Sequence, residues 1–332
     1  MPQLAKFGQE GFRTSQPAQA QLVADGELVP LATSGDVMPG SGERLVGIPD
    51  GIGSWGGKRY MNSYLNHEIS GAARVSKFMI DTRTGSIVFH DYTIDGSEGY
   101  SRLCSASWND AQDGFPGGYF FTGEETSDGV QLALDAQGNI TEMPWVGYYA
   151  HEQQIAVPGF QGSTVIVNFD DDGTSGGPKD NSESEFYMYV ASNSWGTLNG
   201  EGQLYVFASD EESNVGDMSE GETINGYWIP VPEAVALNPT GGPGGKPELD
   251  GWVDEPEHDA FDFTRLEDGF YDKVARANGD NPAVYIFDTG DADLVDPVNG
   301  EWDRWGGIYR MEWQDSKDPT GATTLSLLAR SD

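Results

Sequence analysis

The stretch KFMIDTRTGSIVFHDYTI, residues 77–94, indicates the fold class of this chain. Two runs of alternating apolar and polar residues flank residues 81–85, where Gly85 can adopt the left-handed backbone conformation that a tight turn needs. This pattern predicts two antiparallel strands joined by a hairpin turn. A second hairpin is predicted over 130–143, VQLALDAQGNITEM, with its turn at 137–139.

Short runs rich in Val, Ile, Tyr and Phe recur along the rest of the chain, separated by polar loops. The 45 glycines and 18 prolines punctuate these runs as turn residues, and long amphipathic helical patterns are not visible. Many short strands of this spacing are typical of an all-β sandwich, barrel or propeller. Further strands are predicted at 118–125, 163–172, 185–191, 202–209, 282–290, 306–313 and 324–331.

Acidic clusters follow several predicted strands, at 123–125, 170–172 and 288–293. In a β-propeller the inner strands end at the central channel, where such carboxylates would meet around metal ions. The sequence therefore favours an all-β fold of the β-propeller type with long insertions rich in Gly, Pro and acidic residues. We expect an extended N-terminal segment over 1–45, a single propeller domain over 46–332 and an insertion around 211–262.

The charge of the chain excludes one class of partner. Its 332 residues include 18 Lys and Arg against 54 Asp and Glu, a formal net charge of −36, which repels phosphate backbones and predicts no nucleic-acid binding. Two interpretations of the acidity stay open: a solvated coat suited to a marine or saline environment, or carboxylates that bind hard cations such as calcium. No apolar run of about 18 residues is present, which predicts no membrane span.

Two His-Glu pairs are candidate ligands. The residues LNHE, 65–68, follow an aromatic run, and strand alternation places Asn66 and Glu68 on one face, where their oxygens suit one cation. An exposed polar strand end is the simpler interpretation. His151 and Glu152 also end an aromatic run, and because the chain has only four histidines, this coincidence weakens the interpretation as exposed polar strand ends without removing it.

A run of three acids follows the strand predicted at 163–172. Asp170, Asp171 and Asp172 would repel one another unless a cation or open water screened their charges. A calcium site and a solvated turn are both consistent with this run.

The residues FTRLEDGFYD, 263–272, place Arg265 beside Glu267 and Asp268. One interpretation is a surface ion pair. The other assigns Glu267 to a metal and Arg265 to a substrate phosphate, because the planar guanidinium can bind two phosphate oxygens.

Cys104 is the only cysteine, and Glu124 and Glu125 follow it about twenty residues later. A free cysteine is most often a small apolar core residue. Polar neighbours such as Arg102 and Ser105 suit a metal-bound thiolate better, and a thiolate among oxygen ligands shifts the preference from calcium toward iron or zinc. A nucleophilic role is disfavoured because no His forms a familiar local motif with it.

Taken in order over 66–330, the motifs NHE, RLCSASW, TGEE, AHE, DDD and TRLEDG resemble those of the PhoX-type alkaline phosphatase family. The resemblance implies a six-bladed β-propeller whose channel holds iron and calcium and which hydrolyses phosphate monoesters. It matches Cys104 to an iron-binding cysteine and Arg265 to an arginine whose phosphate-binding role is our own inference. The carboxylates that it assigns to metals are Glu68, Glu124 or Glu125, Glu152, Asp171 or Asp172, and Glu267. Asn66, His151, Asp170 and Asp268 are candidate further ligands.

These observations predict a secreted or periplasmic, monomeric, calcium- and iron-dependent hydrolase that acts on a small phosphorylated substrate, with its export signal absent from this chain. The first 35 residues lack the apolar segment of a signal peptide. Two alternatives stay open: a non-catalytic, calcium-stabilised propeller for binding or surface assembly, and a calcium-dependent lactonase or other esterase. The residues after Cys104 depart from the family's Gly-Gly and Thr-Pro-Trp-Gly pattern, which favours the non-catalytic alternative.

Overall fold

A computed structural model of the chain describes residues 11–20, 25–26, 28–171, 184–258, 260–290, 295–296, 300–301 and 305–330. Strands predominate in these residues and the helices are short, so the all-β prediction is confirmed. The chain divides into two compact units, Met1–Cys104 and Ser105–Asp332. Within the described ranges, no helix is both long and apolar enough to cross a membrane.

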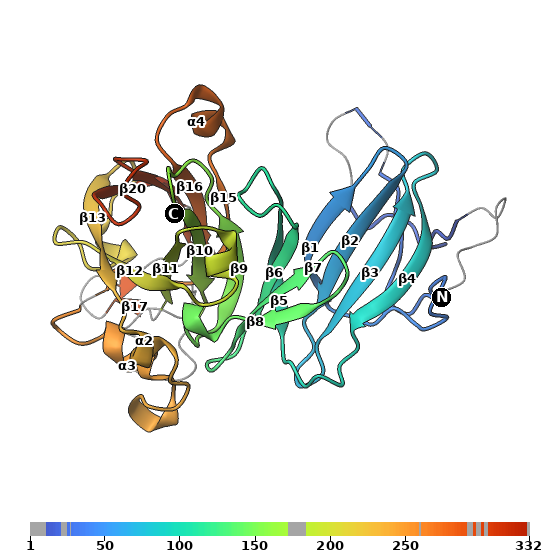
Figure 1. Ribbon diagram of the computed structural model, residues 1–332, viewed down its shortest axis with the longest axis horizontal. Helices are drawn as coiled ribbons and strands as arrows, with labels where there is room; N and C mark the ends of the chain where they lie inside the picture. Colours follow the sequence, from blue (N-terminus) through green and yellow to red (C-terminus); the bar gives the residue numbers. More distant parts are fainter. Residues whose placement is uncertain are drawn as a thin grey trace. The chain divides into compact units, whose positions relative to one another are not determined.

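The first unit is built on an antiparallel sheet whose strands follow one another in chain order (Figure 1). The predicted hairpin is confirmed: the carbonyl of Asp81 accepts the backbone N–H groups of Thr84 and Gly85, and Gly85 has a φ of 57°. A small core of Met38, Leu45, Phe78, Ile80 and Ile87 packs on this sheet. The strands are β1 (Pro49–Gly56), β2 (Tyr60–His67), β3 (Arg74–Asp81) and β4 (Ser86–Ile94).

A chain of hydrogen bonds crosses this sheet through two buried histidines. His67 contacts the Gly47 carbonyl through Nδ1 at 3.0 Å and Ser76 Oγ through Nε2 at 2.8 Å. Ser76 Oγ also lies 3.0 Å from Nε2 of His90, whose Nδ1 lies 3.0 Å from Ser41 Oγ. Since the Gly47 carbonyl can only accept, His67 donates from Nδ1 and accepts at Nε2, and the whole chain is satisfied with both histidines neutral.

We expect the first unit to lose stability as the pH falls from about 6.5 toward 4. Burial, and to a smaller extent the charge of His67, lowers the pKa of His90 to about 4. Between about pH 6.5 and 4, therefore, this side chain binds a proton in the unfolded chain and stays neutral in the folded one. At pH 5 this difference costs roughly 1–2 kcal/mol. Denaturant unfolding at pH 7 and pH 5 measures it, and His90→Gln should reduce the loss by that amount; an unchanged loss would contradict the assignment.

A second four-stranded antiparallel sheet, also in chain order, opens the second unit, and its first strand begins with the last two residues of the first unit. The hairpin predicted over 130–143 is confirmed, because its two strands pair with Leu134 opposite Ile140. The strands are β5 (Leu103–Asn109), β6 (Tyr119–Glu124), β7 (Gln131–Asp135) and β8 (Ile140–Glu142).

The largest sheet of the second unit has the strand order β15-β16-β19-β20-β13-β12-β11-β10-β9. The backbone N–H of Gly269 in β15 donates to Gln153 in β9 at 2.8 Å, so the two ends of the path meet and the sheet nearly closes on itself (Figure 1). Its strands are β9 (His151–Ala156), β10 (Thr164–Asp170), β11 (Ser184–Ala191), β12 (Gly202–Ala208), β13 (Thr223–Pro230), β15 (Leu266–Tyr271), β16 (Ala283–Asp288), β19 (Gly307–Trp313) and β20 (Thr323–Arg330).

Short strands, helices and turns connect the strands of this sheet. One of them, β14 (Asp262–Phe263), pairs with β11. The helices are α1 (Ser194–Thr197), α2 (Glu233–Ala236), α3 (Glu248–Val253) and α4 (Lys273–Asn278), with 3-10 turns η1 (Pro144–Val146), η2 (Val215–Asp217) and η3 (Pro243–Gly245). A separate pair is formed by β17 (Val295–Asp296) and β18 (Gly300–Glu301). The stretch 211–262, expected as an insertion, contains β13, which pairs with both β12 and β20.

Four-stranded antiparallel meanders such as β1–β4 and β5–β8 are the unit of β-propeller blades. The strands of the largest sheet, however, form one continuous path rather than separate blades. Six blades and a single domain over 46–332 therefore stay predictions.

Candidate metal-binding sites

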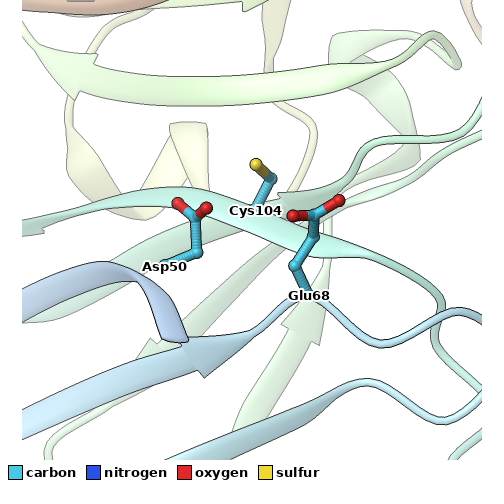
Figure 2. Close-up of side chains that lie close together, drawn as sticks. All are labelled: Asp50, Glu68 and Cys104. Carbon is cyan, nitrogen blue, oxygen red and sulfur yellow. The ribbon is translucent and has the colours of Figure 1, made fainter. Parts of the chain in front are cut away.

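The first candidate site, here called the thiol site, consists of Asp50, Glu68 and Cys104 in the first unit. A sulfur or carboxylate oxygen of each lies within 4.8 Å of those of the other two. Figure 2 shows the two carboxylates and the thiol pointing to the same side of the ribbon. Cys104 is only 7% exposed, Glu68 is half-buried and Asp50 is exposed, so the site has a buried sulfur and an open carboxylate edge.

Two unusual backbone conformations flank the thiol site. Ile48 and Arg102 have φ values of 50° and 49°, and they are the non-glycine residues with positive φ in the described part of the chain. Such a conformation costs about 1–3 kcal/mol and tends to occur at functional sites. Each lies two residues before a site residue, and the Ile48 carbonyl accepts the backbone N–H of Glu68 at 3.0 Å. The strained turns thus set where Asp50 and Cys104 enter their strands.

Arg102 and Asn66 hold the thiol site in place. Arg102 donates to Oε1 of Glu68 from Nε at 2.9 Å and from Nη2 at 2.8 Å, which fixes the carboxylate. Asn66 is fully buried and its Nδ2 donates to the backbone carbonyl of Cys104 at 2.5 Å. Asn66 therefore anchors the backbone beside the thiol.

The second candidate site, here called the carboxylate site, lies in the second unit and consists of Glu152, Asp171 and Glu267. Carboxylate oxygens of the three lie within 4.8 Å of one another. They come from β9, the residue after β10, and β15, which are neighbours because the sheet nearly closes. Glu125, directly after β6, adds a fourth carboxylate, with an oxygen within 4.8 Å of one of Glu152.

Arg265 bonds to two members of the carboxylate site. Its Nε and Nη2 donate to the two oxygens of Asp171 at 3.0 and 2.6 Å, and Nη2 also lies 3.1 Å from Oε1 of Glu267. The Asp171 carboxylate keeps the pKa of Arg265 above its usual value, so the guanidinium stays charged. Of its nitrogens, Nη1 has no hydrogen-bond partner among the described residues and still offers two N–H groups.

Burial raises the pKa of Glu267, and the negative charge of Asp171 raises it further, while Arg265 acts in the opposite direction. Glu152 is 1% exposed and Glu125 is also buried. The site has four carboxylates and one guanidinium, so its negative charge exceeds its positive charge. The donor set, oxygen throughout, fits a hard cation of the calcium class.

The remaining predicted carboxylate and histidine ligands are not members of either cluster, or fall outside the described residues. Glu124 accepts the backbone N–H of Val130 at 3.4 Å, and exposed Asp268 accepts the hydroxyl of Ser105 at 2.6 Å. Asp172 falls outside the described residues. Asp170 lines a separate cavity, described below. His151 is fully buried, with its Nε2 at 3.2 Å from the Gly147 carbonyl and its ring at 3.8 Å from that of Tyr149.

Asp50 is the site residue that the sequence analysis missed. It lies in β1, whose sequence PDGIGSWG has little of the alternation that reveals a strand. The one available signal was an acidic residue at the start of that stretch.

No known protein family and no curated protein matches the sequence. Among solved structures, the chain is similar to PhoX of Pseudomonas fluorescens in complex with vanadate, a transition state analogue, with a TM-score of 0.55 and 14% identity. That match covers 84% of this chain and 66% of the other, so the chain spans less than two thirds of that protein. A mutant apocarotenoid oxygenase from Synechocystis matches with a TM-score of 0.34 and 10% identity, and the match covers 87% of this chain and 64% of the oxygenase chain. This similarity is too weak to support an argument. The comparison therefore shows a PhoX-like fold.

Proposed function

We propose that the chain is a metal-dependent hydrolase of phosphate monoesters. The observation that carries this proposal is the carboxylate site with a charged arginine bonded to it. Clustered carboxylates hold cations, and an arginine beside them suits a phosphoryl group. The likeness in fold to a protein that binds vanadate supports the same reaction class.

The chain's own residues contribute binding and orientation. The two hydrogen bonds that Arg265 donates to Asp171 fix the plane of the guanidinium. Its Nη1, which has no partner among the described residues, would donate to a phosphoryl oxygen. Glu152, Glu267 and Asp171 would hold calcium, which acts as a Lewis acid on phosphoryl oxygens. Because Glu152 and Glu125 are buried, the site keeps much of its charge away from bulk water, where it acts more strongly on a bound anion or cation.

In this proposal, the thiol site binds iron. Its soft sulfur ligand distinguishes it chemically from the carboxylate site, and carboxylates complete a mixed set that iron accepts. The six-bladed propeller, the export of the chain, its monomeric state and its saline habitat belong to the same proposal, supported by the resemblance of the motifs and the net charge of −36.

The proposal is tested by metal analysis together with hydrolysis of p-nitrophenyl phosphate before and after chelation. We expect bound calcium and iron, a loss of at least about 100-fold in rate on metal removal, and recovery on adding both metals. Cys104→Ser should lower bound iron while leaving calcium in place. A metal-loaded protein that hydrolyses no phosphoester would rule out the proposed activity.

One observation favours a second candidate, a non-catalytic binding protein stabilised by calcium. Both oxygens of Asp171 already accept hydrogen bonds from Arg265, an arrangement that also serves a purely structural ion pair. This candidate predicts that calcium raises the melting temperature without any turnover of phosphoester or lactone substrates. The same measurements separate it from the hydrolase.

A further inference from the structure

A small cavity in the second unit is lined by polar and aromatic residues, four of them acidic. Its volume is about 10 Å³, the space of a single water molecule or ion. Two carboxylates in its wall are almost fully buried: Asp170 is 2% exposed and Glu185 is 3% exposed. The residues around it are Ser127, Tyr148, Tyr149, Asp170, Glu185, Tyr187, Asp250 and Asp254.

The strand register explains why these two carboxylates meet. Phe169 of β10 lies opposite Phe186 of β11, so the next pair along the two strands is Asp170 and Glu185. Successive residues of a strand point to opposite faces, which directs Asp170 into this cavity and Asp171 toward the carboxylate site. The adjacent residues Asp170 and Asp171 therefore belong to two different sites, the cavity and the carboxylate site.

Tyr149 supplies an independent sign of a ligand. It is 4% exposed, its ring stacks on that of Tyr187 at 4.6 Å, and the residue lines the cavity. Within the described part of the chain, this hydroxyl has no hydrogen-bond partner. A buried hydroxyl without a partner costs about 1–3 kcal/mol, so a ligand in the cavity is expected to bind its oxygen.

The surrounding charges select the kind of ligand. Tyr187 donates to Oε2 of Glu185 at 3.0 Å, which leaves the other oxygen of that carboxylate for the cavity. Asp250 and the exposed Asp254 bring the carboxylates in the lining to four, and Asp250 is bonded to Lys246 Nζ at 3.0 Å. An anion is excluded by these charges, whereas a hard cation would offset them and accept carboxylate and hydroxyl oxygens as ligands.

We propose that Asp170, Glu185 and Tyr149 form a cation site of the calcium class, separate from the carboxylate site, which links β10, β11 and the segment before β9 (Figure 1). Asp254 and water complete the oxygen ligands, and the exposed side chains of Ser127 and Asp254 mark where the ion enters. The site stabilises the sheet and takes no part in hydrolysis, so it does not depend on the proposed function.

The test compares calcium bound per chain in the wild type, Glu185→Gln and Glu152→Gln, using elemental analysis after gel filtration in calcium buffer. Glu185→Gln should bind one calcium fewer than the wild type, and Glu152→Gln should keep that ion. Calcium should raise the melting temperature of the wild type and of Glu152→Gln, and should do so less in Glu185→Gln. Full calcium content and an unchanged calcium-dependent shift in Glu185→Gln would overturn the site in favour of a water or a proton shared by the two carboxylates.

Tyr149→Phe keeps the proposal testable if Glu185→Gln does not fold. It preserves the ring stacked on Tyr187 and removes only the hydroxyl, so calcium affinity should weaken about tenfold, the equivalent of one ligand contact. Terbium, excited through the tyrosines beside the site, provides a direct readout: its sensitised luminescence should titrate at higher terbium concentration in Tyr149→Phe than in the wild type. Equal affinity in both proteins would contradict the role of Tyr149.

Discussion

Glu152→Gln should lower the rate of phosphoester hydrolysis by about 10²–10³-fold, the effect of removing one preorganised charged group from an active site. The change keeps the size of the side chain and removes one negative charge from the carboxylate site. Because Glu152 is 1% exposed, water cannot replace the lost ligand easily. Hydrolysis of p-nitrophenyl phosphate with calcium and iron present measures the effect.

Glu257→Gln is the matched control for this prediction. It makes the same chemical change in the same unit on an exposed side chain, and activity should stay within about twofold of the wild type. Thermal melts of both variants establish that they fold. Comparable activity in Glu152→Gln and the wild type would remove the carboxylate site from the mechanism.

Trp313→Ala should lower the free energy of unfolding of the second unit by about 3–5 kcal/mol. Trp313 is fully buried in β19, and its ring stacks on Trp228 at 5.8 Å with the planes 4° apart. Phe160 meets the same ring edge-on at 5.4 Å. The substitution leaves a large cavity among these rings and also leaves the Pro319 carbonyl without the indole N–H that donates to it at 2.9 Å.

Denaturant unfolding followed by far-UV circular dichroism measures this loss, and the midpoint should fall with little change in slope. Trp195→Ala removes the same side chain from α1, where it is 60% exposed, and should change stability by less than about 0.5 kcal/mol. Similar losses in the two variants would show that Trp313 is not a principal core residue.

The strands that the sequence revealed are those with strong alternation or a dense apolar run. The hairpin of β3 and β4, and the buried strands β10, β11 and β12, have such patterns and were predicted. By contrast, β13 has the sequence TINGYWIP, whose Gly and Pro suggest a loop. It forms a strand because it pairs on both sides, with β12 and β20, and no local pattern reports such tertiary contacts.

The candidate sites were predicted in part for a similar reason. Glu152, Asp171 and Glu267 were proposed as metal ligands from acidic motifs, and the structure brings them together. The direct pairing of Arg265 with Asp171 could not be predicted, because 94 residues separate them along the chain. Likewise, Glu185 lies inside an apolar strand, EFYMYVA, where only the register with β10 reveals its acidic neighbour.

The near closure of the largest sheet has a consequence for how the protein behaves at high concentration. The end strands of an open sheet expose backbone N–H and C=O groups that can pair with a strand of another molecule and start aggregation. Here β15 meets β9, and the Gly269 N–H donates to the side chain of Gln153. The end strands of this sheet are thus less accessible to strands of other molecules. The net charge of −36 adds long-range repulsion between copies of the chain.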